Sequence, residues 1–283
     1  MLNTTHFIAI GIVLISGFFH ALWNVLAKKS RDKTAFLISI QCLSLLFFLP
    51  WAMMLFKQVV WHWQVVLIFV LSLLMHGLYF LILSRAYSVG HISQIYPIAR
   101  GSSALVAPFS AVFFLGEHLT IIGWIGVAGI VTGVILLGDL RWRQSINQHV
   151  LLAISMGLCI ASYIIIDRMA LKYTSPILVN WIGTVGNILV LSFFLRSKQT
   201  LKREWKKNRS LIFIGCILAP LSYLLFLQAS SMTQVAQLAP IREIGTVFGV
   251  ALGVLFLKEP KAKKRIVASV MVVVGIIFLG INR

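Results

Sequence analysis

Residues 84–117 of this chain read SRAYSVGHISQIYPIARGSSALVAPFSAVFFLGE, and residues 227–259 read LQASSMTQVAQLAPIREIGTVFGVALGVLFLKE. With one gap at Ala99, ten positions are identical, and both copies contain Gln-x-x-Pro-Ile followed by Arg. Chance matching of apolar residues explains the shared Ile, Val, Leu and Phe, but it does not easily produce that polar element twice. We therefore interpret the two stretches as copies of an internal repeat.

The composition places this repeat in a membrane protein. Of the 283 residues, 59% are hydrophobic and 11% are charged, whereas a soluble domain carries about 25% charged residues. The three cysteines are too few for a disulfide scaffold. A net charge of +18 is compatible with a nucleic-acid-binding protein. The basic residues, however, lie in short clusters between long apolar runs, as they do in membrane proteins. We therefore expect membrane lipids, and no nucleic acid, among the partners.

Ten apolar runs have the length of a membrane-crossing helix, which is roughly 17 to 25 residues. We expect an all-α membrane protein with ten transmembrane helices, at about 7–26, 35–55, 65–86, 92–114, 120–138, 150–168, 177–195, 210–228, 234–257 and 266–281. The repeat divides them into two five-helix halves, residues 1–145 and 146–283. Because five is odd, the second half enters the membrane from the opposite face. This predicts an inverted repeat, the architecture of many secondary transporters.

The positions of Lys and Arg predict the orientation of the chain. Nineteen of the 25 lie in the loops that join the helices in pairs, first to second through ninth to tenth, and four lie on the other side. Short loops rich in these residues stay in the cytoplasm. We therefore expect a multi-pass protein of a bacterial-type inner membrane with both termini outside.

The sequence resembles the EamA branch of the drug/metabolite transporter superfamily. The resemblance rests on the ten-helix plan, on Pro-containing helices that end in Gly116–Glu117 or Lys258–Glu259, and on the glycine-spaced helix at 120–138. It covers essentially the whole chain and implies a metabolite or drug carrier with a central cavity lined mainly by helices 1, 3, 4, 6, 8 and 9. Relatives are usually drawn with cytoplasmic termini, so the charge count departs from the family habit.

Three charged residues are predicted deep in the membrane, where each costs roughly 3 kcal/mol or more. Arg100 and Arg242 lie at matching repeat positions, about 13 Å from opposite faces at 1.5 Å per residue. Glu243 is the only acid that we expect at this depth. Neighbours on a helix point about 100° apart, so we expect Glu243 to pair with Arg100 and to leave Arg242 for a carboxylate or phosphate. A purely structural network of all three is the alternative.

Pro97 and Pro240 each remove a backbone hydrogen bond inside a predicted helix. The carbonyls that they free need partners inside the protein or in a wet cavity. Gln94 and Gln237, one turn earlier, are positioned to supply them and are candidate substrate-binding residues. A hinge beside the site and a static kink are both open interpretations.

Further polar or aromatic residues at membrane depth are weaker candidates for substrate binding, because each also fits core packing. Aromatic rings that face a cavity can stack on a flat or cationic substrate. These candidates are Trp23, His76, Tyr79, Tyr163 and Tyr223. His20 or His76 can carry a proton at physiological pH, so a coupling proton or ion is a candidate partner.

These features favour a secondary transporter that moves a small organic metabolite with a carboxylate or phosphate group by alternating access. A flippase for a lipid-linked sugar or phosphate, gripped by both arginines, is the alternative. Dispersed acids and the absence of nucleotide-binding, serine-hydrolase and zinc-hydrolase motifs argue against an enzyme. We expect no metal or other cofactor. The glycine-rich fifth and tenth helices suit packing within the chain or, as a second option, a homodimer face.

Overall fold

The structure, a computed structural model, describes residues 4–89, 92–137, 148–195, 197–257 and 263–281. The regular secondary structure of these ranges is helical throughout. The helices are α1 (Thr4–Lys29), α2 (Lys33–Gln58), α3 (Trp63–Val89), α4 (Ile92–Leu115), α5 (Ile121–Leu137), α6 (Gln148–Ala170), α7 (Pro176–Phe194), α8 (Lys198–Met232), α9 (Val235–Ile241), α10 (Ile244–Leu257) and α11 (Lys263–Gly280). The predicted boundary between the halves, at residues 145 and 146, lies outside the described residues.

The distribution of side chains is that of a membrane protein, with large apolar groups on the outside and polar groups within. Phe113 and Phe193 expose 81% and 85% of their surface, whereas Asp167 and Ser222 are 0% exposed. Eight segments of the described chain are long and apolar enough to cross a membrane, and α5 and the apolar part of α11 are shorter. Helices suit this setting because they satisfy their own backbone hydrogen bonds where water is absent.

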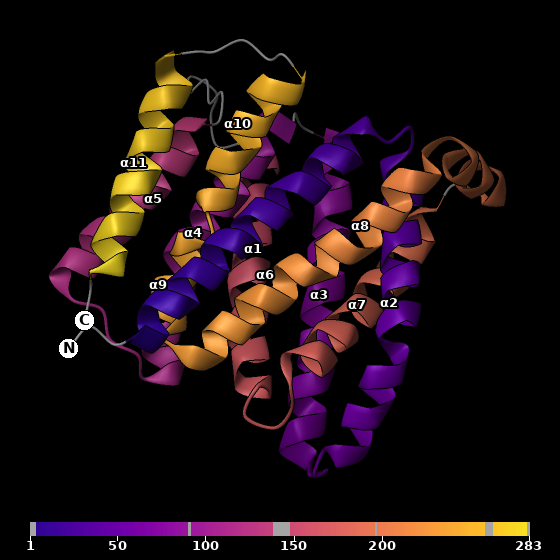
Figure 1. The fold of residues 1–283 in the computed structure, drawn as a ribbon, viewed down its shortest axis with the longest axis horizontal. Coiled ribbons are helices and arrows are strands. Elements are labelled where there is room, and N and C mark those ends of the chain that lie inside the picture. The colour runs from indigo at the N-terminus through magenta and orange to yellow at the C-terminus, as the bar shows by residue number, and fades with distance from the viewer. Residues whose placement is uncertain (1–3, 90–91, 138–147, 196, 258–262, 282–283) are drawn as a thin grey trace.

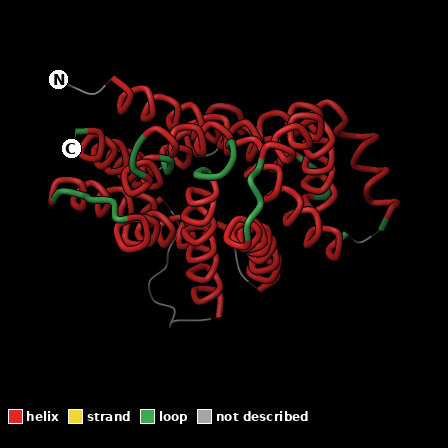
Figure 2. The backbone as a smooth tube through the Cα atoms, turned by 90° about the horizontal axis from the view of Figure 1, so that it is seen from below, coloured by secondary structure: helices red, strands yellow, loops and turns green. Residues whose placement is uncertain are grey.

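The helices form one elongated bundle with a central group and two ends (Figure 1). The pair α5 and α11 stands at one end, and α2 and α7 stand at the other. Between them α1, α3, α4, α6, α8 and the α9–α10 pair pack on one another. Figure 2 shows the same bundle from below, again with both chain termini close together at one end.

The contacts between helices keep their pattern when the two halves of the chain are exchanged. The helix α1 packs on α8, as α6 packs on α3; α4 packs on α6, as α10 packs on α1; and α2 packs on α8, as α7 packs on α3. The contacts of α5 with α11 and of α2 with α7 join helices that the expected repeat makes equivalent. Most of the packing between helices therefore joins the first part of the chain to the second.

Glycines allow α5 and α11 to touch through their backbones. A side chain at Gly275 would place its Cβ 2.5 Å from the carbonyl oxygen of Gly126, and one at Gly126 would lie 2.8 Å from the carbonyl oxygen of Gly275. Neither position can therefore accept a side chain without separating the helices. The close packing predicted for these helices is present within the chain.

Helix α8 begins earlier than predicted. The segment 198–209 is part of the loop expected between the helices at 177–195 and 210–228. It is helical and continues into the apolar part of α8 through a bend at Asn208, whose backbone is non-helical (φ −122°, ψ 27°). Its inner side carries Glu204, which is 1% exposed and accepts hydrogen bonds from the backbone N–H groups of Arg31 and Asp32 before α2. The segment is helical because these contacts give its polar inner face partners, while its lysines and arginines face outward.

The two chain ends meet at the same face of the bundle. His6 on α1 lies with Nε2 3.2 Å from the carbonyl oxygen of Gly280 at the end of α11. Its Nδ1 lies 3.4 Å from the hydroxyl of Thr233, between α8 and α9. The end of α8 and the start of α9 therefore belong to the face that carries both termini, which we call the terminal face.

Candidate functional site

A buried ion pair joins the middle of α4 to the short break between α9 and α10. The Nε of Arg100 donates to Oε2 of Glu243 at 2.9 Å, and Nη2 lies 2.9 Å from Oε1. Arg100 is 5% exposed and Glu243 is 2% exposed. The pairing predicted across the repeat is therefore present, in the two-point geometry that suits a guanidinium and a carboxylate.

The break that presents these groups follows Pro240 by two residues. The N–H of Glu243 donates to the carbonyl of Pro240 at 2.9 Å, and the N–H of Gly245 donates to that of Arg242 at 3.1 Å. These hydrogen bonds reach back three residues, whereas those of a regular α-helix reach back four. Helix α9 therefore ends at Ile241, and α10 begins at Ile244. The chain at 234–257, expected as one helix, is two. Helix α4, in contrast, continues through Pro97.

The guanidinium of Arg242 lies against two aromatic rings. Its guanidinium carbon is 5.0 Å from the ring centre of Tyr223 and 4.7 Å from that of Phe226, both on α8. Such faces attract a cation, and more strongly where water is excluded. Arg242 is 5% exposed, and its Nε has no hydrogen-bond partner among the described residues. The site thus contains a buried guanidinium with donor capacity to spare.

A second buried acid, Asp167 on α6, was missed by the sequence analysis. Asp167 is 0% exposed. Its Oδ1 accepts from the hydroxyl of Ser72 at 2.6 Å. Its Oδ2 accepts from the hydroxyl of Tyr223 at 2.5 Å and lies 3.0 Å from Nε2 of His76. The expectation that Glu243 is the only deep acid was therefore wrong.

The reason for that miss lies in the length of α6. The predicted helix ends at residue 168, which places Asp167 at a membrane edge, whereas α6 runs to Ala170. The neighbouring helices α3 and α8 extend past Asp167. Its partner His76 lies near the middle of α3, and its partner Tyr223 lies nine residues before the end of α8. The predicted repeat offered one signal for this residue. Asp167 aligns with an alanine of the first half, so a charged residue stands where the other copy has an apolar one.

Aromatic residues of α6 and α8 contact the ring of His76. The ring of His76 stacks on that of Tyr163 with centroids 4.3 Å apart, and Tyr223 meets it edge-on at 5.7 Å. Tyr79 meets Tyr163 edge-on at 6.2 Å. On α7, Gly183 leaves room for the imidazole, because a Cβ there would lie 2.9 Å from two atoms of the ring. His76, Tyr163 and Tyr223 are therefore in mutual contact, and Tyr79 joins this group through Tyr163.

The remaining candidates are more dispersed. Trp23 packs toward the separate apolar cluster of Phe36, Ile40 and Ile212, so the structure does not bring it into the group around Arg242. Gln237 is 3% exposed on α9. The backbone of Gln94 lies in α4, but its side chain lies outside the described part of the structure. His20, with Nε2 3.4 Å from the hydroxyl of Tyr96, adds a further polar contact between α1 and α4.

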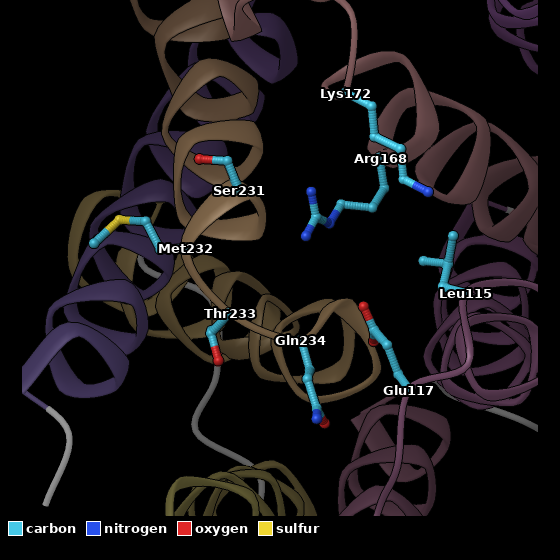
Figure 3. A pocket seen from close by; sticks show the side chains of 8 residues that line it. All are labelled: Leu115, Glu117, Arg168, Lys172, Ser231, Met232, Thr233 and Gln234. Carbon is cyan, nitrogen blue, oxygen red and sulfur yellow. The ribbon is translucent and has the colours of Figure 1, made fainter.

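A cavity of about 340 Å³ opens at the terminal face (Figure 3). It lies between the ends of α4, α6 and α8, and the side chains of Arg168 and Glu117 point into it from opposite walls. Glu117 also accepts a hydrogen bond from the N–H of Ala236 at 2.7 Å and so caps α9. The cavity lining is Leu115, Glu117, Arg168, Lys172, Ser231, Met232, Thr233 and Gln234, which includes none of the predicted binding residues.

Within the described ranges, no group of three or more His, Cys, Asp and Glu side chains is arranged to hold a metal ion. Cys42, Cys159 and Cys216 are free thiols. The chemistry that the arrangement offers is therefore that of charge and hydrogen bonding: one neutralised guanidinium, one with spare donors, and one carboxylate shared by His76 and Tyr223.

Comparison with known proteins agrees with this architecture. Residues 148–281 match the EamA-like transporter family. An uncharacterized protein of Methanocaldococcus jannaschii is 30% identical over 135 residues, which cover 46% of this chain and 97% of that protein. A protein of Listeria innocua, named as a candidate sugar uptake protein, is 27% identical over 212 residues, covering 70% and 73% of the two chains. One crystal structure shares the fold, with a TM-score of 0.74, 12% identity and coverage of 98% and 96%.

Proposed function

The chain belongs to the EamA-like transporter family, and from that membership we propose that it is a secondary transporter for small organic anions. The solute carries a carboxylate or phosphate group and crosses the membrane by alternating access. One observation carries the proposal: Arg242 is a buried guanidinium beside a second one that Glu243 already neutralises. Arg242 cannot give up its charge by losing a proton, so an anionic group is the partner that completes it.

Alternating access is built on ten membrane crossings in two inverted five-helix repeats. Three features support this arrangement: the helix packing keeps its pattern when the halves are exchanged, the termini share one face, and equivalent glycines mark equivalent crossings. Gly17 on α1 lies against Gly245 of α10, and Gly157 on α6 lies against Ser103 of α4. In such folds substrate sites lie near the middle of the membrane, between the repeats.

The orientation expected from the loop charges places the terminal face outside the cell. The cavity at Glu117 and Arg168 then opens to the exterior. Arg168 and Lys172 on its wall attract anions toward the site before they reach Arg242. The structure then corresponds to an outward-facing state.

A flippase is less well supported than a carrier of soluble anions. The flippase hypothesis uses both arginines to hold one phosphate. Arg100 is taken up by its two-point pair with Glu243, at 2.9 Å, so one guanidinium is left for a ligand. A single guanidinium suits a carboxylate or a monophosphate.

Substrates for a first test follow from the site and from the names of the Listeria relatives. The buried arginine favours an anionic group, and the names of the relatives favour a sugar. We would therefore compare a sugar without an anionic group, glucose, with two that carry one, gluconate and glucose 6-phosphate. Binding to purified protein in detergent is read by the shift in heat-induced unfolding and by calorimetry. We expect gluconate or glucose 6-phosphate to bind at least about tenfold more tightly than glucose, because a buried charge-assisted pair contributes about 1.5–3 kcal/mol.

The decisive variant is Arg242→Gln, with Arg209→Gln as the matched control. Arg209 is exposed on α8, so the control removes the same charge outside the site. We expect Arg242→Gln to abolish the preference for the charged sugars, while the control retains it. If Arg242→Gln folds normally and keeps the affinity and transport rate of the unaltered protein, the anion site is refuted. Uptake into liposomes then shows whether the bound solute is also moved.

A further inference from the structure

The buried charges at the centre of the bundle cancel when His76 is neutral. Arg100 and Glu243 neutralise each other at 2.9 Å. Arg242 and Asp167, 5% and 0% exposed, supply one further charge of each sign. The remaining buried carboxyl group among the described residues, that of Glu204, lies at the far end of α8 and accepts a hydrogen bond from the backbone before α2. The central group therefore has no net charge before a substrate binds.

Tyr223 contacts both of the buried charges that have no directly contacting group of opposite charge when His76 is neutral. Its ring lies under the guanidinium of Arg242, at 5.0 Å from the centroid, and its hydroxyl donates to Asp167 at 2.5 Å. The carboxylate of Asp167 is thus the counter-charge of Arg242 across one aromatic ring. A change of charge at either end alters the electrostatic energy at the other, because the intervening space is protein rather than water.

A bound anion disturbs this neutrality by adding one negative charge beside Arg242. We propose that the pair of His76 and Asp167 is a proton-binding site, and that it takes up one proton when an anionic substrate binds at Arg242. The proposal rests on the proposed function for its anion. The proton comes from solvent and adds to Nδ1 of His76, while the Nε2–H continues to donate to Asp167, so the pair changes from one negative charge to none. Anion and proton then cross the membrane together.

The surroundings of the pair contain the groups that set this response. On α3 and α6, Ser72 and Tyr163 contact Asp167 and His76, and Tyr79 lies beyond Tyr163. From α8 the facing group is Tyr223. From α4 come Arg100 and Tyr96, from the α9–α10 break come Arg242 and Glu243, and from α1 comes His20. Helix α7 presents Gly183 to the imidazole and has no charged residue in its sequence. Among these groups, Asp167 and His76 are the acid and the base in direct contact, so the proton is assigned to this pair.

The cavity at the terminal face provides an open space next to the end of α6 for that proton. Arg168, which lines the cavity, is the residue that follows Asp167 on α6 (Figure 3). The end of α6 thus lies between solvent and the buried pair. Asp167 is 0% exposed, so the proton passes through a small local opening rather than through a permanent water path.

Calorimetry with gluconate tests the coupling, because gluconate does not itself titrate above about pH 5. Binding is measured near pH 7 in buffers with different ionisation enthalpies, and the slope of observed enthalpy against buffer enthalpy counts the protons taken up. We expect a positive slope, up to about one proton per gluconate, in the unaltered protein. A slope of zero throughout about pH 5.5–8.5 overturns the proposal even where gluconate binds, and leaves the anion carrier in place.

Two variants locate the proton, and one serves as control. His76→Gln and Asp167→Asn each remove one member of the proposed proton site, so gluconate binding should persist with no proton uptake. His62→Gln, which removes an exposed histidine at the start of α3, should keep the uptake. Uptake that survives both site variants in folded protein places the proton elsewhere and overturns the assignment.

Histidine NMR observes the ring of His76 directly. In protein labelled with ¹³C at histidine Cε1, the signal absent from His76→Gln identifies this ring. A shift of that signal toward the imidazolium position when gluconate is added near pH 7 supports the proton site, and an unchanged signal with gluconate bound overturns it. Absence of binding by all three sugars instead refutes the proposed anion carrier, and with it the proton uptake that rests on it.

Discussion

The guanidinium of Arg100 and the carboxylate of Glu243 meet through two contacts of 2.9 Å, although 143 positions separate them in the chain. The pair ties the first half of the protein to the break between α9 and α10. The pair also determines how many guanidinium groups are left for a ligand, because it neutralises one of the two buried arginines. Removing either partner leaves the other as an uncompensated buried charge.

We therefore predict that Glu243→Gln destabilises the protein by about 3–5 kcal/mol. The double variant Arg100→Gln with Glu243→Gln should lose less than the sum of the two single variants, because no charge is then left unpaired. Chemical or thermal unfolding in detergent measures all three. Strict additivity of the single effects would contradict a direct interaction between the two side chains.

Two substitutions should separate the role of the Tyr223 ring from that of its hydroxyl. Tyr223→Phe keeps the ring under Arg242 but removes the hydroxyl that donates to Asp167, so we expect a loss of about 1–3 kcal/mol in stability with little change in anion affinity. Tyr223→Leu removes both and should also weaken anion binding. The measurements are unfolding in detergent and gluconate calorimetry. Equal anion affinity in the Phe and Leu variants would show that the ring does not hold Arg242.

The contact between α5 and α11 predicts opposite outcomes at neighbouring glycines. Gly126→Ala places a methyl group 2.8 Å from a backbone oxygen of α11, so we expect a loss of about 1–3 kcal/mol. Gly129→Ala meets its nearest atom at 3.6 Å, an ordinary contact, and should be neutral or stabilising by up to about 1 kcal/mol. Unfolding temperatures decide, and similar effects at both positions would argue against this packing.

The distribution of Lys and Arg predicts that both chain ends are outside the cell. A reporter enzyme that folds only outside the cytoplasm should be active when fused after Arg283, and a fluorescent protein that matures only in the cytoplasm should be dark there. Fusions within the basic segment 198–209 should behave in the opposite way. Activity of the cytoplasmic reporter at the C-terminus would reverse the orientation and turn the cavity inward, without changing the site.

Several elements of the site were predictable because they depend on spacing along one helix. The repeat aligned Arg100 with Arg242, and the angle between neighbouring helix positions directed Glu243 toward Arg100 rather than Arg242. The grouping of His76, Tyr163 and Tyr223 followed less directly, from their positions on helices that the family resemblance assigns to a cavity. Trp23 shows the limit of that argument, because a helix in a bundle has several buried sides and Trp23 packs on another cluster.

The sequence by itself determined that this protein is a helical membrane protein and predicted an internal repeat, because length, apolar content and recurring polar positions are properties of the chain. Tertiary structure alone decided that Asp167 is buried, that Arg242 lies on Tyr223 and Phe226, and that the chain breaks after Ile241. The depth of a residue depends on how far the neighbouring helices extend past it. The partner of a charge depends on which side chains those neighbours bring within a few ångströms, and neither quantity is encoded by spacing along a single helix.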